Sequence, residues 1–198
     1  MTENQKLDSA WIGWNEVMRK VASLMRGRDF AAALSEVEAF LARERNPELR
    51  SDALGMRADL REELGDLKGA EEDLRTARSL VGPTYGRYVH ELSLGCVSEK
   101  RESVNEAVSW YQTALRTCIE GEGISGGTAL QKLLRLRAQE VLTAEDRTLC
   151  ARAAQKSWQV LGLPGEPDLA DISRAVSTIK EGEANPPRRR RSPDPLED

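Results

Sequence analysis

The chain has 198 residues, of which 39% are hydrophobic and 31% charged, and its net charge is −4. Alanine, leucine, arginine and glutamate dominate, and because these residues favour helices, the composition predicts an all-α fold. The negative net charge provides no general basic surface for nucleic acid, so we do not expect a nucleic-acid-binding protein.

Nothing in the sequence points to export or to a membrane segment, so we expect a cytoplasmic protein. The polar start, Met-Thr-Glu-Asn-Gln-Lys, does not resemble a signal peptide. No apolar stretch approaches the roughly 18 residues that a spanning helix needs. Three cysteines without paired spacing argue against a disulfide framework and for a reducing compartment.

The chain is expected to begin with a flexible segment, residues 1–8, followed by a pair of helices. Ser9 is a good N-cap for the first helix, which should end at Gly27. The partner helix should start at Asp29 and end before Pro47, because proline interrupts a helix.

The second pair repeats this plan. Pro47 suits the first turn of a helix that should extend to Leu64. Gly65 then supplies a C-terminal stop, and Asp66 supplies the N-cap of the next helix, which should end at Gly82.

The third pair is expected to begin near Thr84. Ser103 followed by Glu106 has the spacing of a capping box, in which each side chain satisfies a backbone N–H group at the start of a helix. The second helix of this pair should therefore begin after Ser103.

The last third of the chain is less regular. Ala144 keeps the spacing of the earlier alanines, but Thr148 follows it where an apolar residue is expected, so we treat that match as coincidence. The predicted segments are a glycine-rich link (121–127), a helix pair (128–142 and 143–161), a capping helix (168–181) and a disordered Arg/Pro-rich tail (185–198).

The second helices of the first three pairs share one spacing of residues in the sequence. An alanine recurs every 37 residues, and a large apolar residue follows each alanine by four positions. Self-similarity at this period predicts an array of stacked helical hairpins, since alanines let helices approach and large residues fill the gaps. The alanines are Ala33, Ala70 and Ala107, and the large residues are Val37, Leu74 and Tyr111.

These units resemble tetratricopeptide repeats (TPRs) over roughly residues 15–117, within a repeat domain expected at 9–161. The family period is 34, so a period of 37 implies longer helices or longer links. The residues that carry the resemblance are Val21, Phe30, Ala33 and Val37 in the first unit, Gly65, Asp66, Ala70, Leu74, Ala77 and Pro83 in the second, and Gly95, Ala107, Tyr111 and Ala114 in the third.

The resemblance implies a right-handed superhelix whose concave face holds an extended or helical peptide. Placing the first helices of the units in register predicts which residues face this groove. They are Met18, Ala22, Met25, Asp52, Met56, Asp59, Glu62, Glu63, Leu92, Cys96 and Glu99.

The predicted groove combines methionines, which adapt to varied ligands, with an acidic middle unit. A basic or amphipathic segment of another protein would suit it, although the acids could equally form a solvated face. Some TPR proteins bind chaperone tails through cations and amides. The matching places hold Met18, Ala22, Met56, Val89 and Ser93, so we do not expect that ligand.

No catalytic, metal or cofactor site is predicted. Gly121, Gly123 and Gly126 spell the dinucleotide pattern GxGxxG, but a predicted helix precedes them where that motif needs a strand. The lone histidine, His90, allows no three-histidine metal site and is expected on the surface or in the groove. The cysteines are expected to pack between helices.

Two terminal features leave alternatives open. Arg188–Arg191 could make weak contacts with nucleic acid, fold back onto the acidic groove as a lid, or keep the tail soluble, and Ser192 could regulate these contacts by phosphorylation. Trp11 and Trp14 share a helix face that could cover the edge of the first hairpin or form an interface.

The sequence therefore predicts a non-enzymatic adaptor that binds a partner segment in a concave groove. The alternative is a regulatory or oligomerising subunit that uses its terminal helices, and the sequence leaves the oligomeric state undecided. A small helical enzyme or nucleotide binder is a third hypothesis, which depends on little more than the glycine link.

Overall fold

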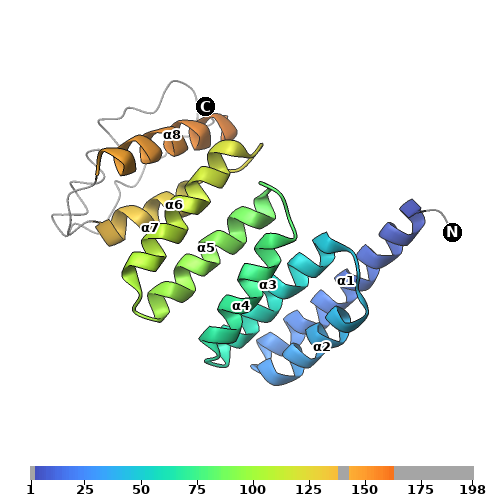
Figure 1. The fold of residues 1–198 in the computed structure, drawn as a ribbon. Helices are drawn as coiled ribbons and strands as arrows, with labels where there is room; N and C mark the ends of the chain where they lie inside the picture. Colours follow the sequence, from blue (N-terminus) through green and yellow to red (C-terminus); the bar gives the residue numbers. More distant parts are fainter. Residues whose placement is uncertain (1–2, 138–142, 163–198) are drawn as a thin grey trace, which may run out of the picture.

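The structure is a computed structural model, and it describes residues 3–137 and 143–162. The described part of the chain is helical and contains no strand, which confirms the predicted all-α fold (Figure 1). The predicted capping helix (168–181) and Arg/Pro-rich tail (185–198) lie outside the described residues.

Consecutive helices pack against each other as hairpins, and the hairpins follow one another along an elongated array in chain order (Figure 1). Helix α6 contacts both α7 and α8, which continue the array at its C-terminal end. The helices are α1 (Glu3–Arg26), α2 (Phe30–Arg43), α3 (Pro47–Glu63), α4 (Leu67–Ser79), α5 (Tyr85–Lys100), α6 (Val104–Glu120), α7 (Gly127–Arg137) and α8 (Ala144–Val160).

The predicted start of the first helix is wrong. Helix α1 begins at Glu3 rather than after Ser9, so helical structure extends into the segment that was expected to be flexible. The residues before Ser9 include Glu, Gln, Lys and Leu, which are good helix formers, and serine is tolerated inside a helix.

The turn inside each of the first three hairpins has the same backbone geometry at an interval of 37 residues. A residue with positive φ ends the first helix: Arg28 at 60°, Gly65 at 83° and Glu102 at 61°. The next residue donates its N–H to a carbonyl five positions back, as in a Schellman motif, and also occupies the N-cap position of the second helix. These donors are Asp29 to Leu24, Asp66 to Arg61 and Ser103 to Ser98.

The recurring alanines occupy equivalent places, as the sequence predicts. Ala33, Ala70 and Ala107 are each the fourth residue of their helix, and each is fully buried. Ala144 is instead the exposed first residue of α8, so the fourth match is a coincidence. Three hairpins therefore share one internal register.

The side chains that fill the hairpins compensate each other in size. In each unit, two buried positions 16 residues apart pair a residue of the first helix with one of the second. As the second residue grows along the array, the first shrinks, which keeps the packed volume similar. The pairs are Val21 with Val37, Ala58 with Leu74, and Gly95 with Tyr111.

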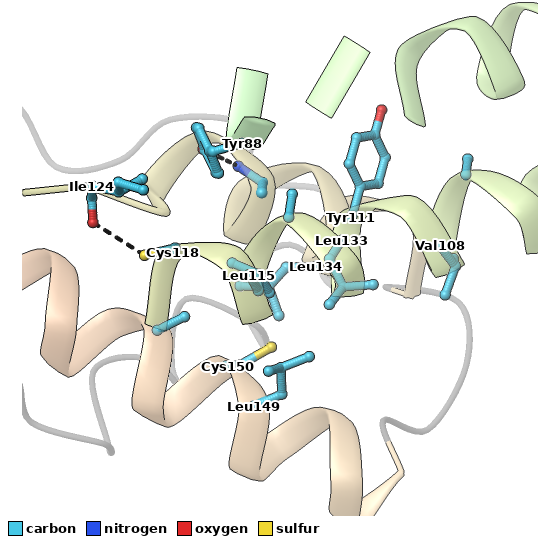
Figure 2. Packing of buried hydrophobic residues seen from close by; sticks show 14 residues of the cluster. Tyr88, Val108, Tyr111, Leu115, Cys118, Ile124, Leu133, Leu134, Leu149 and Cys150 are labelled. Carbon is cyan, nitrogen blue, oxygen red and sulfur yellow. Dashed lines mark hydrogen bonds between the residues drawn. The ribbon is translucent and has the colours of Figure 1, made fainter. Parts of the chain in front are cut away.

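The buried residues form three clusters along the array. One joins α1–α4, a smaller one joins α3, α4 and α5, and the largest lies around α6 (Figure 2). Figure 2 shows Tyr111 and Leu115 of α6 in this last cluster, with Cys150 of α8 packed beneath them.

The glycine-rich link is a packed connection between α6 and α7. A Cβ at Gly126 would lie 2.9 Å from the Cys118 sulfur, and the Gly126 N–H donates to Ser157 Oγ at 2.8 Å. The Cys118 thiol lies 3.2 Å from the carbonyl oxygen of Ile124 in the same link (Figure 2). Close packing therefore explains glycine here, with no need for a bound phosphate.

The predicted capping box at Ser103 is wrong. Ser103 makes no side-chain cap, and Glu106 instead accepts a hydrogen bond from Arg75 of α4 at 2.9 Å. An ion pair between neighbouring units has replaced the local contact. A capping box does occur at α8, where Thr143 and Asp146 satisfy each other's backbone N–H groups.

Candidate binding groove

A hollow of about 410 Å³ opens between the first helices of the three units, α1, α3 and α5. Its apolar lining consists of Trp14, Met18, Met56, Leu74, Tyr85 and Val89. Its remaining lining consists of Asp52, Asp59, His90, Ser93, Gly55 and Gly86. This hollow, called the groove below, is therefore mainly apolar with a few polar groups, as ligand sites commonly are.

The structure brings part of the predicted set together. Met18 of α1 and Asp52, Met56 and Asp59 of α3 line the groove, as the sequence predicts. The three α3 residues follow one another at i, i+4 and i+7, which places them on one helical stripe.

The third-unit residues of the predicted set do not line the groove, because α7 and α6 engage them. Glu99 accepts hydrogen bonds from Tyr111 and Arg135, and Lys132 of α7 lies 3.6 Å from it. Cys96 contacts the Tyr111 hydroxyl at 3.5 Å, and Leu92 packs against the cluster around α6.

The other predicted residues also lie outside the groove lining. Glu62 forms a 2.5 Å ion pair with Lys100 of α5, and Glu63 is exposed. Met25 packs against the core of the first units, and Ala22 is half-buried beside it. Helix register alone predicts that all of these residues face the groove. Contacts between units, which register does not contain, decide which residues line it.

Sequence reasoning missed two aromatic side chains of the groove. Trp14 is buried and stacks on Phe40 with ring centroids 4.8 Å apart, so it covers the first hairpin as well as lining the groove. Tyr85 is 66% exposed at the start of α5. Its position directly after the N-cap Thr84, in the first turn of α5, was the available signal.

His90 is 4% exposed, so the expectation of a surface position is wrong, although the residue does line the groove. Its Nε2 lies 2.8 Å from Ser51 Oγ, whose hydroxyl donates to the Ala77 carbonyl at 3.1 Å. A hydroxyl has one hydrogen, so His90 Nε2–H must donate to Ser51 and Nδ1 must be the acceptor. Burial lowers the pKa of His90, which favours this neutral form.

The two groove carboxylates are held in an environment that disfavours their charge. Desolvation, with Glu62 adding repulsion, raises the pKa of Asp59 to about 6. Desolvation and the charge of Glu48 raise the pKa of Asp52. Both residues are nevertheless exposed at the mouth of the hollow, so water screens much of these effects.

The remaining buried ionisable groups serve the packing between helices. Glu91 is fully buried and is neutralised by Arg78 at 2.6 Å and Arg87 at 3.1 Å, while Thr117 donates to its other oxygen at 2.6 Å. Burial raises the pKa of Cys150 to about 11 and also raises that of Cys118, so both thiols are poor nucleophiles at neutral pH. Within the described residues, no cluster of three potential metal ligands occurs.

Comparison with known proteins gives a fold likeness. No family model matches the chain, and no curated protein matches it. Among solved structures, it is similar to the crystal structure of BtubC (BKLC) from P. vanneervenii, with a TM-score of 0.59 and 18% identity over 100% of this chain and 99% of that one. At this identity the likeness shows the fold alone. Among the described residues, none of the helices has the length and apolar character that a membrane crossing requires.

Proposed function

We propose that the protein is a non-enzymatic, TPR-like adaptor that binds a segment of another protein in the groove. The observation that carries this proposal is an open hollow, lined by the first helices of three successive units, in which apolar side chains surround two carboxylates. Rows of parallel groove-lining helices suit an extended or helical peptide, whose apolar residues would replace water against Met18 and Met56.

The expected partner segment is basic or amphipathic. The only formally charged residues of the lining are Asp52 and Asp59, so the groove presents negative charge to its ligand. Such charges increase the association rate of a basic segment, while the apolar contacts supply most of the affinity. A cytoplasmic location and a ligand other than nucleic acid or membrane belong to the same proposal.

The test compares partners captured by the wild type and by Met56→Lys, which places a cation among the apolar lining residues. Thr76→Lys is the matched control, because Thr76 is exposed on α4 and does not line the groove. The binding segment of any captured protein is then mapped and titrated by calorimetry. We expect Met56→Lys to lose this segment and Thr76→Lys to retain it. Equal affinity for both variants would refute the proposal.

The alternative function is assembly through the terminal helices. Trp11 is 38% and Ile12 is 61% exposed on α1, so this helix presents a large apolar surface to solvent. If it mediates self-association, light scattering should give an oligomer that Ile12→Asp converts to a monomer. A monomeric wild type at high micromolar concentration would exclude this function.

A further inference from the structure

We propose that the groove is a receptor for one arginine side chain of the partner segment, with the guanidinium bound between Asp52, Asp59 and the Nδ1 atom of His90. This inference depends on the proposed function, because it names the anchor residue of the same groove. It follows from the carboxylates, the histidine acceptor and the apolar walls together.

The carboxylates of Asp52 and Asp59 form no ion pair or hydrogen bond with the described side chains, residues 11–136 and 143–162. The charge of Lys100 acts on Asp59 without direct contact. Other acids nearby do have partners: Glu62 pairs with Lys100, and Asp73 lies 2.5 Å from Arg57. The array thus pairs Glu62 and Asp73 internally and leaves Asp52 and Asp59 exposed in the hollow, where an external cation can reach them.

The groove lining supplies no cation to them. No lysine or arginine is among the lining residues, and Lys100, whose charge acts on Asp59, is already bound to Glu62. A bound guanidinium would therefore complete the charge balance of the groove without displacing an existing ion pair.

His90 adds an acceptor at the base of the same groove. Its Nε2 is committed to Ser51, which leaves Nδ1 as an acceptor without a partner among the described residues. Gly55 and His90 both line the groove, and a Cβ on Gly55 would lie 3.3 Å from Nδ1, so this edge of the ring faces α3 at the groove floor. A ligand donor can therefore satisfy an otherwise buried side chain.

These acceptors favour arginine over lysine. A guanidinium has five N–H donors in a planar fork, so it can bind carboxylates and an imidazole nitrogen at the same time, whereas an ammonium is a compact point charge. The methylene stem would pack against Met18, Met56 and Val89, and the exposed ring of Tyr85 offers a face for stacking.

The experiment uses the full chain with ¹³C-methyl methionine and three small probes: Nα-acetylarginine N-methylamide and its citrulline and lysine counterparts. We expect saturable shifts of the Met18 and Met56 methyl signals with the arginine probe. The citrulline probe keeps the shape and loses the charge, so its affinity should be at least about tenfold weaker, as expected for loss of charge-assisted hydrogen bonds. Equal shifts with arginine and lysine, or none with arginine, would overturn the proposal.

Variants locate the binding site. Asp52→Asn and Asp59→Asn remove one charge each with little change in shape, and each should weaken the arginine probe by about tenfold. Glu72→Gln is the matched control, because it removes one exposed charge from α4, outside the groove. Unchanged affinity in both asparagine variants would refute the site.

The outcomes separate this inference from the proposed function. A mapped partner segment that requires Met56 but binds without arginine would overturn the arginine site and leave the adaptor intact. Arginine-probe binding that needs Asp52 and Asp59, with no partner segment sensitive to Met56→Lys, would support the site and refute the adaptor.

Discussion

At the scale of single residues, Gly95 of α5 packs directly against the ring of Tyr111 of α6. A Cβ at this position would lie 2.3 Å from a ring carbon, nearer than any real contact. The ring has no room to move, since it is fully buried and its hydroxyl donates to Glu99. Glycine is therefore required by the size of the residue opposite.

Gly95→Ala should destabilise the protein by about 1–3 kcal/mol, because overpacking outweighs the gain in helix propensity. Gly13→Ala, where no atom lies within 4 Å, should instead stabilise it by about 1 kcal/mol. Adding Tyr111→Leu to Gly95→Ala reproduces the second unit, and urea unfolding should then show a favourable coupling of about 1 kcal/mol or more. Strict additivity would contradict the compensation of size.

The raised pKa of Asp59 predicts a pH-dependent stability. The folded protein holds this proton up to about pH 6, whereas the unfolded chain releases it near the ordinary value of 3.8. The unfolding free energy contributed by this group should therefore fall as pH rises from about 4 to 6 and then stay level. Asp59→Asn removes the trend.

Unfolding of the wild type and of Asp59→Asn should be compared from pH 4 to pH 7. The advantage of the variant should be smallest at pH 4 and should reach a plateau above pH 6. A difference that does not change over this range would show that Asp59 is not desolvated.

The sequence predicted single residues well where helix register decides their place. Met18, Asp52, Met56 and Asp59 line the groove because they share one face of their helices. Glu99 does not, because its partners come from α6 and α7, and no local pattern reveals a contact across 36 residues. The burial of His90 was missed for the same reason, since its partner Ser51 belongs to the preceding unit.

At the scale of elements, the turns of the three hairpins have the same backbone geometry although their residues differ. Only Gly65 is suited to positive φ, and Arg28 and Glu102 adopt the same geometry against their own preference. The turn is therefore imposed by the packing of the two helices that it joins.

Glu102→Gly should stabilise the protein by about 0.5–1 kcal/mol, because glycine removes the strain at positive φ and loses only part of this gain to chain entropy. Glu102 is exposed, so removal of its side chain loses few packing contacts. Gly65→Ala should have the opposite effect, with a loss of about 1 kcal/mol. Thermal unfolding measures both, and a destabilised Glu102→Gly would contradict the imposed turn.

Element types were predictable, but some of their ends were not. The alanine interval and the glycine and proline breaks are local signals, and they placed the helices correctly. The extension of α1 to Glu3 and the pairing of Glu106 with Arg75 depend on the stability of neighbouring turns and units, which local cap patterns do not contain.

At the scale of the whole molecule, the middle of the array has the smallest buried cluster. It contains Ala58, Ala70, Leu74, Leu94 and Val97, between two larger clusters. In a repeat array, stability is a sum of units and of the interfaces between neighbours, so lost packing in this cluster should weaken the connection between the two ends.

Leu74→Ala should cost about 2–5 kcal/mol, because Leu74 is almost fully buried. The same change should split a single denaturant transition into two, as the N-terminal and C-terminal clusters lose their connection. Val108→Ala, within the largest cluster, should lower stability without this separation. A single cooperative transition for Leu74→Ala would contradict the prediction that the middle cluster connects the two larger ones.

The graded sizes of the facing pairs have a consequence for building with this chain. The joints of the three hairpins are alike in shape, so segments of 37 residues could be exchanged without altering the turns. The interiors of the hairpins differ. Gly95 of α5 leaves room for a tyrosine on the facing helix, whereas Val21 of α1 does not. A transplant or duplication should therefore move both helices of a unit together, and a chimera that mixes single helices should leave a hole in one unit and a clash in another.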